Sequence, residues 1–180
     1  MRPSLTDELD AFLRVSATWI MIDRWRARLT EPFVPSPGSE LALDDEDWPP
    51  MPVSQVAWQG LGSAAMHLHG LRLHLDVTPP QKLELVPFAQ LSLARGALVG
   101  AAQAVWVLSP PDRGTRTARA RTATRYFMEE HRKFLAPLQT LTEQPHASTG
   151  SVAEHTKLRL DELDALRARD GQKPGWTQSA

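Results

Sequence analysis

The sequence predicts an all-α protein, a single up-and-down bundle of about five helices. Fifteen prolines punctuate the chain, and the stretches between their clusters carry apolar residues at helical spacing. Proline interrupts a helix because it lacks the amide donor, so the clusters mark the expected ends of helices. No stretch alternates polar and apolar residues for long enough to predict a strand. The 180 residues suit one domain, which we expect to span 1–170 with a flexible tail at 171–180.

The first two helices are expected at 4–30 and 53–77. In the second, small and apolar residues turn inward at helical spacing: Val56, Gly60, Ala64, Leu68, Leu71 and Leu75. Residues 31–52 between them form a long Pro-rich loop with five acidic residues: Glu40, Asp44, Asp45, Glu46 and Asp47. We interpret this loop as a solvated crossover or as a docking segment, in which Trp48 is the candidate anchor.

The most apolar stretch, residues 88–108, predicts a third helix with one charge, Arg95. Its long polar side chains point in different directions around the helix, so we expect it to be buried on all sides. A membrane span is disfavoured, because Arg95 at mid-helix costs about 2.5 kcal/mol to insert. Four small residues recur every four positions, and we expect another helix to approach closely along them: Ser92, Gly96, Gly100 and Ala104.

A fourth helix is expected at 112–136, with Pro137 kinking or restarting it. Its inward face would carry Ala120, Phe127, His131, Phe134 and Leu138. A fifth helix is expected to begin at Ser151, which forms a capping box with Glu154, and to end before Gly171.

Arg95 is the candidate ligand-binding or ion-pairing residue. Among Leu91, Leu98 and Val99, a buried guanidinium without a counter-ion would be strongly destabilising. We therefore expect a carboxylate from another helix, Asp23 or Asp76, or else an opening to a pocket or a partner surface. A carboxylate or phosphate would be the natural ligand.

Composition excludes several classes of chemistry. The chain has no cysteine, so disulfides, thiol catalysis and cysteine-based zinc sites are excluded. His67 and His74 are seven residues apart, about 10 Å along a helix, too far to share one metal ion. No glycine-rich phosphate loop or nucleophile motif occurs, so we expect neither metal nor cofactor. Acidic residues near the N-terminus replace the apolar core of a signal peptide, which predicts a cytoplasmic protein.

The fourth helix carries the main concentration of basic residues. Arg121, Arg125 and Arg132 fall within about 40° of one another on a helical wheel. Such a stripe is typical of a surface that follows a nucleic-acid backbone. A solvated helix face, or a face paired with the acidic residues 40–47, explains the same pattern.

Residues 53–135 resemble a group of uncharacterised bacterial helical proteins. The shared pattern is an Arg-x-Ala-Leu-Glu central helix, then Trp-x-Leu-x-Pro and an Arg-rich helix. This chain has Arg95-Gly96-Ala97-Leu98, with Val99 where the pattern has Glu, and Trp106-Val107-Leu108-Ser109-Pro110.

More distantly, such bundles resemble the HEPN superfamily, some members of which are metal-independent ribonucleases with an Arg and a His separated by four to six residues. Arg125 and His131 have this spacing. The resemblance implies that Arg125 stabilises phosphate charge and that His131 is the general acid–base. A histidine packed in the core or at an interface is the other interpretation of His131.

Three function classes remain open from the sequence. The leading one is a non-catalytic interaction or regulatory module that forms a homo-oligomer or binds a protein partner. The second is a HEPN-like ribonuclease or RNA-binding protein of toxin or defence type. The third binds a small anion between helices near Arg95. No membrane partner is expected.

Overall fold

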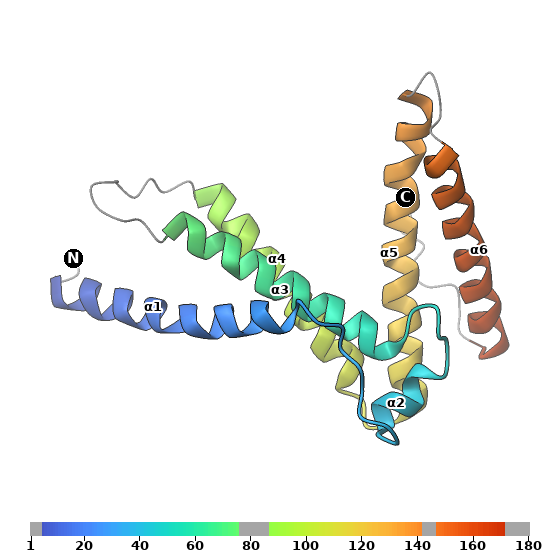
Figure 1. The fold of residues 1–180 in the computed structure, drawn as a ribbon, viewed down its shortest axis with the longest axis horizontal. Helices are drawn as coiled ribbons and strands as arrows, with labels where there is room; N and C mark the ends of the chain where they lie inside the picture. The colour runs from blue at the N-terminus through green and yellow to red at the C-terminus, as the bar shows by residue number, and fades with distance from the viewer. Residues whose placement is uncertain (1–4, 76–86, 142–146, 172–180) are drawn as a thin grey trace.

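The computed structural model describes residues 5–75, 87–141 and 147–171, and confirms the all-α fold class (Figure 1). Six helices, five long and one short, pack in a bundle, and the described residues contain no strand. They are α1 (Leu5–Arg28), α2 (Glu40–Asp45), α3 (Val53–Leu75), α4 (Pro87–Leu108), α5 (Arg113–Leu141) and α6 (Ala147–Arg169).

The helices form two groups that meet at α2. α3 and α4 pack along each other in opposite directions, and α1 packs on α3 (Figure 1). The α5–α6 hairpin stands at a steep angle to this first group, with α2 beside the junction (Figure 1). The core lies where α3, α4 and α5 converge, and contains Val53, Val56, Val107 and Ala120.

The backbones of α3 and α4 touch at Gly60 and Gly100. A Cβ atom added to Gly60 would lie 2.8 Å from the carbonyl oxygen of Gly100, and one added to Gly100 would lie 2.6 Å from that of Gly60. Ala104 is 2% exposed at the same contact. The prediction that another helix approaches closely along this ridge is therefore confirmed.

The expectation that the third predicted helix is buried on all sides is wrong. α4 buries one face, at Ala97, Gly100, Ala104 and Val107, against α3 and α5. Leu91, Leu98 and Val105 on the opposite side are 66%, 70% and 65% exposed. The reason is the position of α1, which packs on α3 and makes no contact with α4, so no described helix covers that side.

Residues 31–52 are more ordered than the loop that the sequence predicts. They include the short helix α2, which begins after Ser39, whose hydroxyl accepts a hydrogen bond from the Ala42 amide at 3.2 Å. Asp45 then binds the start of α3, accepting from the Ser54 amide at 2.8 Å and the Ser54 hydroxyl at 2.6 Å. Trp48 is 7% exposed, so this aromatic anchors the segment to the protein's own core.

The last two helices differ from their predicted bounds and faces. α5 continues through Pro137, which is exposed, so water can satisfy the carbonyl one turn earlier. α6 begins at Ala147, so Ser151 does not cap it, although Gly171 ends it with a positive φ of 67° as predicted. Residues 172–180 of the predicted tail lie outside the described residues.

The inward face predicted for the fourth helix is only partly correct. Ala120 is buried, but Phe127 and Phe134 are 54% and 67% exposed, and His131 is exposed. Beyond the junction, α6 is the one described helix that packs on α5 (Figure 1). Its buried positions are instead mostly polar: Arg116, Thr117, Arg121 and Thr124.

Replacing Gly100 by alanine should destabilise the fold. The new methyl group would overlap the Gly60 carbonyl, and relief requires the two backbones to separate, which we expect to cost about 1–3 kcal/mol. Urea unfolding followed by circular dichroism measures the effect. Gly114→Ala is the control, because its added Cβ would approach nothing closer than 3.6 Å; equal stability of the two variants would contradict the close contact.

Candidate functional site

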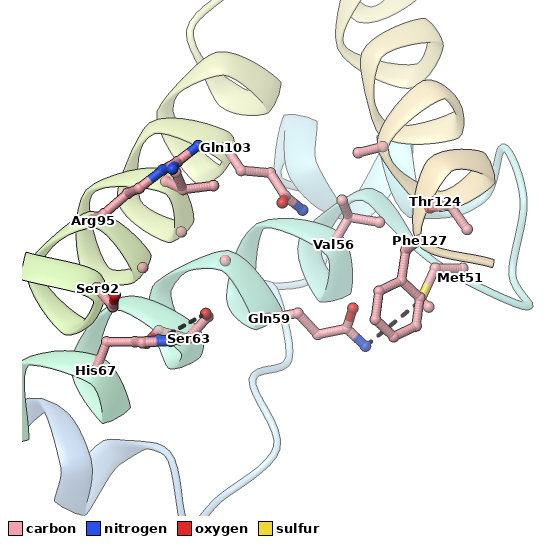
Figure 2. Close-up of a pocket in the computed structure, with 15 residues that line it drawn as sticks. Met51, Val56, Gln59, Ser63, His67, Ser92, Arg95, Gln103, Thr124 and Phe127 are labelled. Carbon is pink, nitrogen blue, oxygen red and sulfur yellow. Dashed lines mark hydrogen bonds between the residues drawn. The ribbon is translucent and has the colours of Figure 1, made fainter. Parts of the chain in front are cut away.

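A cleft of about 550 Å³ opens between α3, α4 and α5, with Arg95 at its edge (Figure 2). This volume is within the range of small-molecule sites. α4 contributes Arg95 and Gln103 and α3 contributes Gln59 and His67, whereas α5 contributes Thr124 and Phe127. The cleft therefore joins the two groups of helices and has both polar and apolar walls.

Arg95 is exposed, so the expectation of a buried guanidinium is wrong. Of the two counter-ions proposed, Asp23 pairs with Arg72 at 2.6 Å, and Asp76 lies outside the described residues. Within the described part of the chain, no carboxylate lies in ion-pairing distance of Arg95. Its side chain opens to the cleft, which is the other arrangement that the sequence predicts.

His67 has a defined orientation at one wall of the cleft. Its Nδ1 lies 2.7 Å from the Ser63 carbonyl oxygen, so we assign the proton to Nδ1, which donates to that oxygen. The other edge of the ring packs against Gly96, where any added Cβ would overlap it. This histidine therefore contributes a wall of fixed orientation.

Thr124 brings an unsatisfied polar group to the cleft. It lines the cleft from α5, is 2% exposed, and its hydroxyl has no hydrogen-bond partner among the described residues. Most buried hydroxyls are paired, and a helical threonine ordinarily bonds the carbonyl one turn earlier. Thr124 is therefore an exception that a ligand would explain.

The acidic segment docks onto α5 through a buried ion pair. Asp44 is 0% exposed and accepts two bonds from Arg116, at 2.6 Å from Nε and 3.2 Å from Nη2. Arg116 also donates to the carbonyls of Pro110 and Pro111, and Asp44 raises its pKa against the opposing effect of burial. Of the alternatives left by the sequence, pairing of residues 40–47 with the Arg-rich helix is the arrangement observed.

Arg121 makes a second bridge and is 4% exposed. Its Nε donates to Asp47 at 2.8 Å, and its Nη1 donates to Asp170 at the end of α6. Burial disfavours the charged form, but the two carboxylates outweigh this effect and raise the pKa of Arg121 above its ordinary value. Arg121 in turn lowers the pKa of Asp170.

The other two members of the predicted nucleic-acid stripe also have carboxylate partners. Arg125 binds Asp164 at 2.6 Å, and Arg132 binds Glu129 at 2.8 Å. The stripe is therefore an ion-paired surface, with Arg121 withdrawn from solvent.

The structure does not bring the predicted ribonuclease pair together. Arg125 and His131 lie on one continuous helix, where six residues place them about 120° apart around the axis and about 9 Å apart along it. Arg125 is held by Asp164 on α6, and the His131 ring contacts Phe127 with centroids 6.2 Å apart. The ribonuclease alternative stays a prediction from spacing alone.

A metal centre is not formed by the described side chains. Across 5–75, 87–141 and 147–171, no three histidine or acidic side chains lie close enough to hold one ion.

The exposed side of α4 is the second candidate site. We define the outer face of α4 as Leu91, Ala94, Leu98, Val99, Ala102, Val105 and Trp106, with Arg95 among them; all of these are exposed. Among the described helices, α4 is also the one long and apolar enough to cross a membrane. Only 22% of its most apolar stretch is buried inside the protein. Arg119 fixes Trp106 by donating to its carbonyl at 2.7 Å and lying 5.2 Å from its ring centre.

Comparison with known protein families, curated proteins and solved structures finds no match. The resemblances stated from the sequence therefore reduce to an all-helical protein without an identified family. The function must be argued from the cleft and from the outer face of α4.

Sequence reasoning missed three residues of the cleft: Thr124, Gln59 and Gln103. A signal existed for the glutamines, because each interrupts an apolar helix without an obvious solvent face. None existed for Thr124, because threonine is common in exposed helices.

Asp44→Asn should destabilise the protein by about 3 kcal/mol, because it leaves the buried Arg116 guanidinium without its main counter-ion. Thermal unfolding followed by circular dichroism measures the loss. Glu46→Gln is the matched control, since Glu46 is an exposed acid of the same segment. If both variants melt like the wild type, the docking of the acidic segment is not a structural requirement.

Proposed function

We propose that this protein is a non-catalytic, self-associating helical module, in which a second copy covers the outer face of α4. The observation that carries the proposal is the exposure of this face on the most apolar helix of the chain. Contiguous exposed apolar surface on a soluble protein marks an interaction site.

The spacing of the face suits another helix. Leu91, Leu98 and Val105 are seven residues apart, and Ala94, Ala101 and Leu108 each follow three residues later. These are the two core positions of the seven-residue repeat of a coiled coil, and the pattern occurs three times in succession. Ala94 and Ala101 at the second core position allow two helices to approach closely. A copy of α4 is therefore a suitable partner.

Charge favours a second copy over a lipid bilayer. Arg95 lies within the outer face, and placing it at the centre of a bilayer costs about 2.5 kcal/mol or more. Between two protein helices, its aliphatic part can cover apolar neighbours while the guanidinium reaches water at the edge. α4 has no acidic residue, so pairing two copies buries no carboxylate.

Leu98→Glu should convert the oligomer to a monomer, because a carboxylate at the centre of the interface would lose its hydration. Size-exclusion chromatography with light scattering, run over a range of concentrations, measures the change. Leu158→Glu is the matched control, because Leu158 is a 57% exposed leucine on α6 and should leave the mass unchanged.

A wild type that is monomeric at all concentrations would contradict the proposal. Flotation of the wild type with lipid vesicles, abolished by Leu98→Glu, would instead assign the face to a membrane. Retention of the oligomer in the Leu98→Glu variant would mean that the association does not depend on the outer face of α4.

A further inference from the structure

The cleft between α3, α4 and α5 has a consistent charge. None of the described residues that line it is acidic, and Arg95 is the one among them with a permanent charge. A site with one guanidinium and no carboxylate attracts an anion, because no negatively charged side chain opposes its binding.

The two ends of the cleft differ in polarity. Arg95, Gln103 and Ser92 project from α4 at one side, whereas Met51 and Phe127 lie at the other, with Val56 and Gln59 between them (Figure 2). A ligand that spans the cleft therefore needs a charged head and an apolar body. A single planar guanidinium can bind one carboxylate through two parallel hydrogen bonds and balance its charge.

Thr124 adds a requirement at the apolar end. Its buried hydroxyl has no partner in the part of the chain that the structure describes, and rotation about its Cα–Cβ bond exchanges the hydroxyl with the methyl group. A polar atom on the far end of a ligand would then satisfy it. Phe127 lies beside it in the cleft and is half exposed, so it offers a ring surface for the body of the ligand.

We infer that this cleft binds a small aromatic or similarly apolar monocarboxylate, with the carboxylate on Arg95 and a polar substituent at Thr124. The inference goes beyond self-association, and it assigns a ligand class to Arg95, Thr124 and the cleft between them. Arg95 is a binding residue in this account, and Thr124 sets specificity for the far end of the ligand.

The test uses para-hydroxycinnamate as the probe and its neutral amide as the comparison, with calorimetry as the measurement. The wild type should bind the carboxylate about ten-fold more tightly than the amide, and Arg95→Gln should remove this difference. Thr124→Val should weaken binding of the carboxylate probe by about five-fold. Removing the hydroxyl from the probe should weaken its binding to the wild type by the same factor and should leave its binding to Thr124→Val unchanged.

A Val105→Glu variant separates this inference from the proposed self-association. Val105 is an exposed residue of the outer face that does not line the cleft and lies ten residues from Arg95, so a monomeric Val105→Glu variant should bind the probe as the wild type does. Absence of binding at millimolar probe would overturn the inference. An Arg95→Gln variant that binds the carboxylate as tightly as the wild type does would overturn it as well. Because Arg95 is exposed, its replacement does not threaten folding.

Discussion

The contact between the backbones of α3 and α4 at Gly60 and Gly100 is the constraint on which the rest of the structure depends. It permits the two helices to approach until a single added methyl group would overlap a carbonyl. To reach this distance, α4 must turn its small residues toward α3, and Leu91, Leu98 and Val105 then point the other way. The exposed apolar face and the position of Arg95 beside the cleft both follow from one close contact between helices.

A second constraint holds the α5–α6 hairpin in place. Asp44 and Asp47 bring the acidic segment onto Arg116 and Arg121, and Asp170 ties the end of α6 to the same point. Buried ion pairs contribute less net stability than their contacts suggest, because each charge loses its hydration. They do require that the paired side chains meet at hydrogen-bond distance, and here they join α5, α6 and the acidic segment. We infer that these pairs set the angle between the hairpin and α3. That angle opens the cleft, whose third wall is α5.

Several elements were predictable from local patterns. Proline clusters placed the five long helices, the i+4 series of small residues found the α3–α4 contact, and Gly171 ended α6 as expected. The failures have a common cause. A helical wheel says which side chains lie together, but not how many neighbours a helix has. Arg95, Leu98 and His131 were expected in the core because that reasoning assumed neighbours on every side, whereas α1 packs on α3 alone. The ion pairs of Arg116 with Asp44 and of Arg121 with Asp47 join residues more than seventy positions apart, so charge composition suggested them without identifying the partners.

The most direct measurement of the central claim uses the absence of cysteine from the chain. A single Leu98→Cys substitution places one thiol on the outer face of α4, and Leu158→Cys places one on α6 for comparison. The rate of reaction with a soluble thiol reagent is then measured as the protein concentration rises. If a second copy covers the outer face, the thiol at position 98 reacts more slowly at higher concentration while the thiol at 158 keeps its rate. A rate at position 98 that is independent of concentration would contradict the account.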